Sequence, residues 1–324
     1  MSCFYPVFRV KEAVAVDTFV LCFLNNYLGR QILKEIVGTS QLVLSEKKLN
    51  SLRIAVPPVS EQKKIAKILS VCDRAIELKQ KLVEELQSLK KTCLSKMFPR
   101  NGENVPELRF PSFTAPWEQR KLDDIFDFLQ NNTLSRADLD TETGVAKNVH
   151  YGDVLIKFGE YLDASSSTLP YIPSQPILDK FKGSLLQDGD VIMADTAEDE
   201  AVGKCTEITG LQGFPTISGL HTIPLRPKEK FAPGYLGYYM NSGSYHDQLL
   251  PLMQGIKVTS VSKSAILNTD ISYPVDNDEQ AKIGGFFIRL ENLITLHQRE
   301  LEEERKRKTT LMRLLLTGIV RVNA

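Results

Sequence analysis

Apolar residues recur in steps of three and four residues in two long segments that lie far apart in the chain. In the first segment, eight of ten such positions are apolar. This spacing predicts a long helix with one packed seam. The ten positions are Ile65, Ile68, Cys72, Ala75, Lys79, Leu82, Leu86, Leu89, Cys93 and Lys96.

The second segment opens with the same spacing, at Ile283, Phe286, Leu290 and Leu293. The pattern weakens through the charged run RELEEERKRK (299–308) and resumes with Leu311, Leu314 and Leu315. A charged run of this kind is most often a solvated helix face, and the alternative is a surface that docks a partner. We therefore expect a second long helix.

Both helices are expected to begin just beyond a proline-marked extended stretch. Ser60 and Asp278 are the candidate N-caps, since short polar side chains accept hydrogen bonds from the first free backbone N–H groups. The first helix should end near Phe98–Pro99, and Gly318 should stop the second.

The beginning of the helix is written twice. Glu61-Gln62 returns as Glu279-Gln280, and Lys64-Ile65 as Lys282-Ile283. Upstream, residues 23–58 parallel residues 238–275, each with a glycine (Gly38, Gly255) before a serine-containing β-rich stretch. A repeat at this distance indicates two homologous halves rather than a solenoid. The first copy reaches Met1 while the second continues back to about Phe110, so we interpret the N-terminal half as a remnant.

Residues 110–275 are expected to form one compact α+β domain. The stretch 101–117 is rich in proline and is typical of a loop. LDDIFDFL (122–129) favours a helix, whereas 150–159, 185–195 and 216–227 favour strands with tight Gly-Asp turns.

Composition is that of a soluble globular protein, with 324 residues, 42% hydrophobic and 25% charged. The apolar stretch 13–24 is short and broken by Asp17, so neither a membrane span nor a signal peptide is expected. The scattered cysteines indicate thiols in a reducing cytoplasm. The net charge is zero, and residues 110–275 hold 13 basic and 21 acidic residues. If DNA is the partner, long-range attraction must come from another subunit.

No motif supports catalysis by this chain. A P-loop, GxGxxG, HExxH and the Asn/Asp-Pro-Pro-Tyr/Phe methyltransferase motif are all missing from the sequence. ADTAEDE (194–200) offers the carboxylates of Asp195, Glu198, Asp199 and Glu200 for a metal site, but a solvated acidic loop is the favoured interpretation. The four histidines lie far apart and lack partners at ligand spacing.

Three features together resemble the specificity subunit of type I restriction–modification enzymes, over essentially the whole chain. The most specific is an extended stretch ending in proline, then Glu-Gln-x-Lys-Ile and a long helix, written as PPVSEQKKI (57–65) and PVDNDEQAKI (274–283). The others are NVPELRFPSF…WE at 104–118, which resembles a domain start of this family, and the phrases YGDVL and DGDVI.

The resemblance implies an α+β fold in which two long helices pack as an antiparallel coiled coil beside a globular target-recognition domain. It divides the chain into a remnant of a first recognition domain (1–57), a central helical spacer (58–100), a complete recognition domain (101–277) and a distal helical spacer (278–324). The helix length would set the separation of two DNA half-sites.

The resemblance also implies a subunit without a catalytic site or cofactor of its own. Its partners would be double-stranded DNA and the methyltransferase and restriction subunits, which would carry S-adenosylmethionine, ATP and magnesium for adenine methylation and cleavage. The chain departs from the family pattern in its short first domain, so whether it reads a two-part site alone is in doubt. Pairing of two copies would supply a second domain.

Candidate DNA contacts fall in three groups. Short hydroxyl side chains and cations after Gly255 suit phosphate and base-edge contacts, with a solvated hairpin as the alternative. They are Lys257, Thr259, Ser260, Ser262 and Lys263. A polar patch in LQNNTLSRADL suits adenine and guanine, with a helix-capping loop as the alternative; it comprises Gln130, Asn131, Asn132, Thr133 and Arg136. Weaker candidates are Tyr151, Lys157 and His221, and Tyr151 has core packing as its alternative.

Candidate docking positions for the partner subunits are taken from the two predicted seams. They are Ile65, Ile68, Leu82, Leu86, Leu89, Ile283, Phe286, Leu290 and Leu293. Two other functions stay open at this point. The chain could be a rearranged specificity cassette with little activity of its own, or a helical adaptor whose globular domain binds protein.

Overall fold

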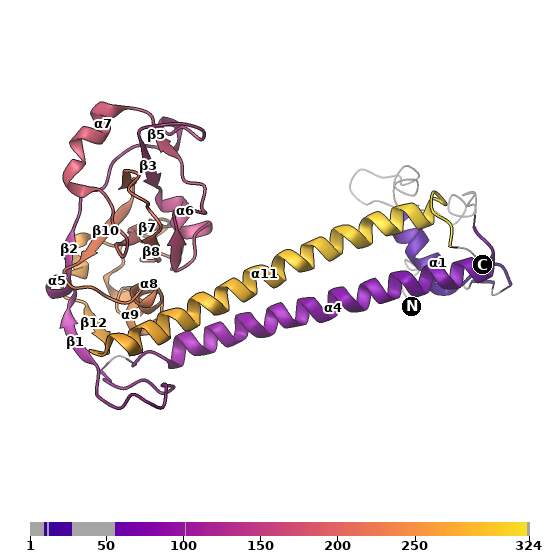
Figure 1. Cartoon of the computed structure of the whole chain (residues 1–324), viewed down its shortest axis with the longest axis horizontal. Helices are drawn as coiled ribbons and strands as arrows, with labels where there is room; N and C mark the ends of the chain where they lie inside the picture. Colours follow the sequence, from indigo (N-terminus) through magenta and orange to yellow (C-terminus); the bar gives the residue numbers. More distant parts are fainter. Residues whose placement is uncertain (1–9, 12, 28–55, 101, 323–324) are drawn as a thin grey trace. The chain divides into compact units, whose positions relative to one another are not determined.

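Two long helices and a mixed α+β unit dominate the part of the chain that the structure describes (Figure 1). The computed structural model describes residues 10–11, 13–27, 56–100 and 102–322. The chain divides into two compact units, Met1–Glu85 with Ile294–Ala324, and Leu86–Leu293. Helices α4 (Val59–Lys96) and α11 (Asn277–Leu316) each contribute to both units. The two predicted long helices are confirmed.

Within the described residues, the β structure consists of four small sheets, all in the 86–293 unit. The largest has the order β2-β10-β6-β8-β4, with β4 parallel to β8 and the other pairs antiparallel. A second has the order β5-β3-β9, and β1–β12 and β11–β7 are antiparallel pairs. The strands are β1 Glu118–Lys121, β2 Phe126–Phe128, β3 Ala146–Val149, β4 Tyr161–Asp163, β5 Tyr171–Ile172, β6 Val191–Ala194, β7 Thr196–Ala197, β8 Cys205–Thr209, β9 Thr216–Ser218, β10 Thr222–Pro227, β11 Thr259–Ser260 and β12 Asp270–Tyr273.

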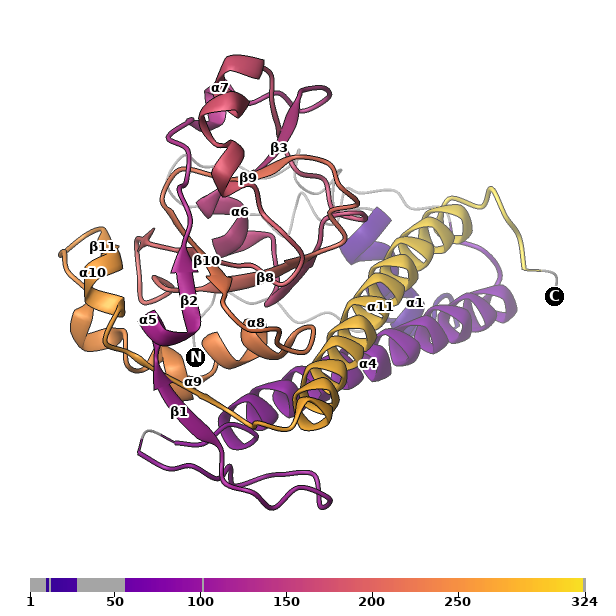
Figure 2. The ribbon, with the colours of Figure 1, turned by 60° about the vertical axis from the view of Figure 1, so that its left-hand side comes forward.

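Short helices connect these strands (Figure 2). The α-helices are α5 Leu122–Ile125, α6 Tyr151–Ile156, α7 Gln175–Lys180, α8 Tyr235–Met240, α9 Gly243–His246 and α10 Lys263–Ile266. Three single 3₁₀ turns are η2 Arg136–Asp138, η3 Lys182–Ser184 and η4 Leu250–Leu252. Sheets of mixed direction with short helices between them confirm the predicted α+β class, and β6, β9 and β10 confirm the strands expected in 185–195 and 216–227.

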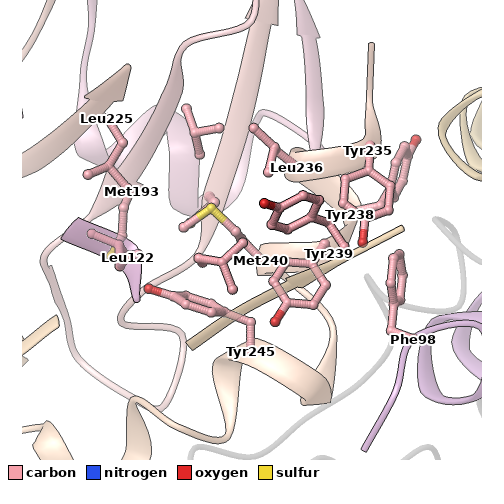
Figure 3. Packing of buried hydrophobic residues seen from close by; sticks show 14 of the residues in the cluster. Phe98, Leu122, Met193, Leu225, Tyr235, Leu236, Tyr238, Tyr239, Met240 and Tyr245 are labelled. Carbon is pink, nitrogen blue, oxygen red and sulfur yellow. The ribbon is translucent and has the colours of Figure 1, made fainter. Parts of the chain in front are cut away.

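The core of the 86–293 unit is built around the aromatic side chains of α8 (Figure 3). The rings of Tyr235 and Tyr239 stack with centroids 6.1 Å apart, and Phe98 lies edge-on to Tyr239 at 5.6 Å. Phe98 also stacks on Phe287 of α11, with centroids 5.8 Å apart. Each such side chain stabilises the fold by roughly 1.5–3 kcal/mol through burial. The same core therefore joins the end of α4 and the start of α11 to the strands and short helices of the 86–293 unit.

The other unit contains a smaller core that also includes a stacked pair of aromatic rings. Helix α1 (Asp17–Cys22) continues into a π-helical turn, η1 (Phe23–Tyr27). Phe19 and Phe23 stack with centroids 5.7 Å apart and are buried with Ile65, Leu69 and Leu315. They repeat the spacing of Tyr235 and Tyr239. Most of the expected remnant, 1–57, lies outside the described residues.

Ion pairs join α4 to α11 in each unit, and the two pairs in the first unit show that the helices pack antiparallel there. In the first unit, Asp73 pairs with Lys308, and Lys79 Nζ lies 2.7 Å from Glu300 Oε2. In the second, Lys90 of α4 lies 2.7 Å from Glu291 of α11. The partner numbers fall as the α4 numbers rise, so the two helices run in opposite directions.

The packed seam differs from the predicted one at every second position. Ile65, Leu86 and Cys93 lie on the seam as expected, but Leu69 and Val83 are buried where Ile68 and Leu82 were expected. On α11 the buried side chains include Ile283, Phe287, Leu290, Ile294 and Leu301, while Phe286 is half-buried. From Ile283 the seam thus steps four residues to Phe287 and three more to Leu290, whereas the predicted seam stepped three and then four residues; on α4, Leu69 likewise lies four residues after Ile65.

Three predicted seam residues are consequently exposed, and the prediction was wrong for them. Leu82 is 38% exposed, Leu89 46% and Leu293 45%. Both step orders fit an apolar heptad, since apolar residues stand at both alternatives, as at Leu82 and Val83 or Leu293 and Ile294. The structure selects the order that buries Val83 and Ile294, at 6% and 3% exposure.

The Glu-Gln pair at the start of α11 holds two other chain segments. Arg109 donates from Nε and Nη2 to the two oxygens of Glu279, at 2.7 and 2.8 Å. The side-chain amide of Gln280 donates to Pro274 O at 2.8 Å and accepts from Ala232 N at 3.1 Å. Both side chains of the pair are buried. The pair therefore fixes the segment that contains Arg109 and the segment before α8 to the helix.

The pair at the start of α4 makes equivalent contacts in the other unit. Arg321 donates from Nε and Nη2 to Glu61, at 2.7 and 2.5 Å. Gln62 donates to Pro57 O and Val14 O and accepts from Val16 N at 2.9 Å. The repeated Glu-Gln of the sequence is thus a repeated structural clamp, in which the segment after one helix closes on the start of the other.

Some local predictions were wrong. Within HYGDVLIKFG (150–159), residues 151–156 form helix α6 rather than a strand, because Tyr151, Val154 and Leu155 share one helical face and His150 caps the first turn. LDDIFDFL is helical only to Ile125 and then enters β2. Neither expected N-cap is correct. Ser60 lies inside α4, which begins at Val59. Asp278 lies inside α11, and the side chain of Asp276, just before that helix, accepts a hydrogen bond from Asp278 N. The predicted ends are confirmed: α4 ends at Lys96, and Gly318 has φ +75° just after α11.

Candidate nucleic-acid interface

Tyr151 and His221 lie at the centre of a polar cluster in the 86–293 unit. Tyr151 opens α6, and its ring meets that of His221 edge-on, with centroids 5.2 Å apart. His221 adopts φ +54°, an uncommon conformation for a residue with a side chain. It connects β9 to β10, and its side chain is 47% exposed. The strained turn thus presents an imidazole at the surface.

His221 is held from its other side by the acidic loop. Its Nδ1 lies 3.3 Å from Asp195 Oδ1 and 3.4 Å from Thr196 Oγ1. Thr196 Oγ1 donates to Asp195 Oδ1 at 2.7 Å, and Asp195 N donates to His221 O at 3.1 Å. The carboxylate nearest to the cluster therefore orients a histidine.

The loop after Gly255 joins the same cluster through β7. In the β7–β11 pair, Ser260 lies opposite Thr196 and Thr259 opposite Ala197. Val261 N donates to Asp195 O at 2.9 Å. Thr259 and Ser260 on one side and Tyr151 on the other are thus brought close to His221, although they lie far apart in the sequence.

Arg136 faces α6 on the other side of Tyr151. Its Nη1 and Nη2 each lie 2.9 Å from an oxygen of Asp153. Asp153 is almost fully buried, while the Arg136 side chain is 53% exposed. The hydrogen bond to Asp153 raises the pKa of Arg136. Burial lowers the pKa of His150, and the positive charge of Arg136 lowers it further. The bidentate pair holds the guanidinium at the surface with donors left over.

The asparagines of the polar patch have different surroundings. Asn132 is 1% exposed, and its Nδ2 donates to Asn148 Oδ1 at 2.6 Å and Ser218 O at 3.0 Å. Its amide is therefore committed to the fold, which contradicts a base-reading role. Asn131 is half-buried and donates to Gly219 O at 3.3 Å, whereas Gln130 and Thr133 are exposed.

The remaining predicted cations and hydroxyls also divide into side chains that are engaged within the fold and side chains that are exposed. Ser262 caps α10 by accepting from Ala265 N at 3.2 Å. Lys263 Nζ lies 3.2 Å from Leu129 O, beside Gln130, and burial lowers its pKa. Lys157 donates to Thr168 O at 2.8 Å, at the far end of α6 from Tyr151. Lys257 is exposed.

Sequence reasoning missed the residues that position this cluster. Asp153 and His150 support α6, while Asp195 and Thr196 support His221. Asp153 lies 17 positions from Arg136, and Asp195 and Thr196 lie 26 and 25 positions from His221, so no local spacing reveals these contacts. The one usable signal was the occurrence of Asp and His beside predicted contacts, which by itself fits a solvated loop equally well.

One known protein family matches two separate stretches of the chain, and each stretch contains the glutamate of one clamp. The family described as the type I restriction modification DNA specificity domain matches residues 4–88 and again residues 115–304. The chain belongs to this family. The expected family is thereby confirmed, and each matched stretch contains one of the two Glu-Gln helix starts.

Relatives of this specificity-domain chain carry the corresponding name. The specificity subunit of the type I restriction enzyme MjaVIII from Methanocaldococcus jannaschii is 27% identical over 295 residues, which are 88% of this chain. The chain spans 66% of that relative's length.

Solved structures support the fold. The HsdS subunit from Thermoanaerobacter tengcongensis superimposes with a TM-score of 0.51 at 16% identity, covering 94% of this chain and 70% of that one. The S subunit of a type I restriction–modification system from M. genitalium gives a TM-score of 0.55 at 16% identity, covering 93% and 72%.

Two other kinds of site were tested on the described residues. None of the helices they form is both long and apolar enough to cross a membrane. Across 10–11, 13–27, 56–100 and 102–322, no three His, Cys, Asp or Glu side chains are grouped so that they could hold a metal ion. The acidic loop at 195–200 instead supplies Asp195 to His221.

Proposed function

We propose that the chain is the DNA-sequence-recognition subunit of a type I restriction–modification complex and does no chemistry itself. Residues 101–277 would read one half of a bipartite site, while methyltransferase and restriction subunits carry S-adenosylmethionine, ATP and magnesium. The complex would act in the cytoplasm. The observation that carries the proposal is the doubled clamp within a chain of the specificity family, because it fastens a recognition unit to a helix pair.

The proposed reading surface is the cluster around Tyr151 and His221. Arg136 offers a guanidinium fork suited to guanine, and Gln130 an exposed amide suited to adenine. Thr259, Ser260 and Lys257 add short donors and a cation for phosphates. Asp195 is engaged by His221 and Asp153 by Arg136, so these two carboxylates orient the donors.

The proposed docking surface for methyltransferase subunits lies on one flank of each helix. Leu78, Leu82 and Leu89 are exposed on α4, and Leu293 and Leu296 on α11. Relative to the seam, these leucines occupy the same two heptad positions on both helices. A repeated apolar flank suits two copies of one partner, each contacting one helix.

Pairing of two copies of the chain is a further part of the proposal. The described residues contain one folded recognition unit, and a single half-site of a few base pairs discriminates poorly. Two copies would present two units and raise the effective affinity. The site would then be symmetric and interrupted.

Purification with the methyltransferase subunit, followed by DNA binding, tests the proposal. We expect co-purification and enrichment of one sequence from a random duplex pool, with affinity that falls steeply as salt rises. Leu82→Asp should weaken co-purification, while Glu84→Gln, an exposed change on the same helix, should not. A complex that forms but binds all duplexes equally would favour a protein-binding adaptor.

A further inference from the structure

The loop between Gln254 and Ser260 is tightly closed. The two residues exchange backbone hydrogen bonds, from Gln254 N to Ser260 O at 2.9 Å and from Ser260 N to Gln254 O at 2.8 Å. Between them, Gly255 adopts φ +120°, and a Cβ at this position would overlap the carbonyl oxygen of Val258. Only glycine fits this backbone, so the two backbone hydrogen bonds and Gly255 define the loop's conformation.

The tip of this loop is apolar. Ile256 is 102% exposed, which means that its side chain touches nothing else in the described residues, and Val258 is 53% exposed. Lys257 between them is also exposed. Single exposed apolar residues are common on protein surfaces. Here, however, an isoleucine and a valine flank a cation on a rigid support.

The loop adjoins the candidate nucleic-acid interface. Ser260, at its base, lies opposite Thr196, and Thr196 contacts His221. In the repeated half, the stretch after Gly38 reads Thr-Ser-Gln (39–41) where this loop reads Ile-Lys-Val (256–258). The apolar tip therefore distinguishes the recognition unit and is not a constant part of the repeat.

We propose that Ile256 is a wedge that inserts between adjacent base pairs of bound DNA, with Lys257 on the flanking phosphate. The proposal rests on the DNA-recognition function proposed above. Apolar wedges partly unstack a base step and bend the duplex, and the cost of unstacking depends on the sequence of that step. The wedge would thus add specificity at a step that no hydrogen-bond donor reads. A side chain flush with the surface would suffice for contact with a thymine methyl, whereas full protrusion suits insertion.

The test uses the full chain assembled with its methyltransferase subunit, and a duplex enriched from a random pool by the wild-type complex. The base analogue 2-aminopurine is placed at each position of that duplex in turn, since its fluorescence rises when it is unstacked. We expect the wild-type complex to raise the fluorescence at one base step. Ile256→Ala should abolish the rise and weaken binding by about tenfold, a change of about 1.4 kcal/mol. Ile256→Leu should retain both.

Ile156→Ala is the matched control. Ile156 is 89% exposed in the same unit and also precedes a lysine, but that lysine is engaged with Thr168 O. This variant should bind and unstack like the wild type. If Ile256→Ala gives wild-type affinity and fluorescence, the wedge is overturned while sequence recognition stands. Loss of co-purification with the methyltransferase subunit, with unstacking retained, would make the tip a protein contact and also overturn it. If the wild-type complex enriches no sequence, the proposed function and the wedge both fail.

Discussion

Arg321 forms two hydrogen bonds with Glu61, 260 positions earlier in the chain, in the same arrangement that joins Arg109 to Glu279. Each arginine follows the end of one long helix, and each glutamate lies in the first turn of the other. The same arginine–glutamate pair therefore occurs once in each of the two units and joins the segment after one long helix to the start of the other. This device accounts for the repeated Glu-Gln of the sequence.

Breaking the better-buried clamp should destabilise the fold. The side chains of Arg109 and Glu279 are 11% and 1% exposed. Arg109→Met leaves a buried carboxylate without its partner, so we expect the free energy of unfolding to fall by about 3 kcal/mol. Urea denaturation measures this. Arg100→Met, which removes an exposed arginine 3.5 Å from Glu107, is the control and should stay within about 0.5 kcal/mol of the wild type.

Adjacent residues on α11 separate packing from docking. Ile294 is buried at 3% exposure, while Leu293 is 45% exposed. Ile294→Asp places a charge in the seam and should lower the free energy of unfolding by about 3 kcal/mol or more. Leu293→Asp should change stability little and should weaken co-purification with the methyltransferase subunit. Equal destabilisation by both variants would contradict the observed seam.

The two helices, their C-terminal ends and the α+β class could be predicted from sequence because heptads, prolines and turn glycines act locally. The seam could not, since Leu82 and Val83 both fit an apolar heptad and only packing decides between them. Helix α6 was missed because its cap, His150, is not a common capping residue. The burial of Asn132 and the pairing of Arg136 with Asp153 depend on strands that meet only in the folded chain.

A buried carboxylate should make stability depend on pH. Glu207 is 3% exposed and accepts hydrogen bonds from Gly234 N and Gly237 N at 2.7 and 3.0 Å. Burial nevertheless raises its pKa from the usual 4.5 to about 7. Between these values the native state holds a proton that the unfolded chain releases. Stability should therefore fall as pH rises through this window, by at most about 1.4 kcal/mol per unit, and level off above it.

Glu207→Gln tests the cause of that slope. Glutamine cannot ionise, so urea denaturation between the two pKa values should show a flatter profile than the wild type. The exposed change Glu302→Gln on α11 should leave the slope as it is. A wild-type profile already flat across the window would contradict the assignment.

Arg136 should read a base. Arg136→Ala should weaken binding to the selected duplex by about 1–3 kcal/mol and relax the preference at one base pair. Lys157→Ala, which removes a cation engaged with Thr168 O, should alter the preference at no position. Competition binding with single-base variants of the duplex measures both. Uniform weakening across all variants would make Arg136 a phosphate contact instead.

Mapping adenine methylation across a genome tests the central proposal, that residues 110–275 choose the DNA sequence. The complex would be expressed with this chain and then with 110–275 replaced by the matching domain of a relative. The account predicts that methylation occurs at a symmetric, interrupted site, and that the replacement changes every specified base in it. If half of the target persisted after the replacement, residues 1–57 would be reading DNA, and the account would be wrong.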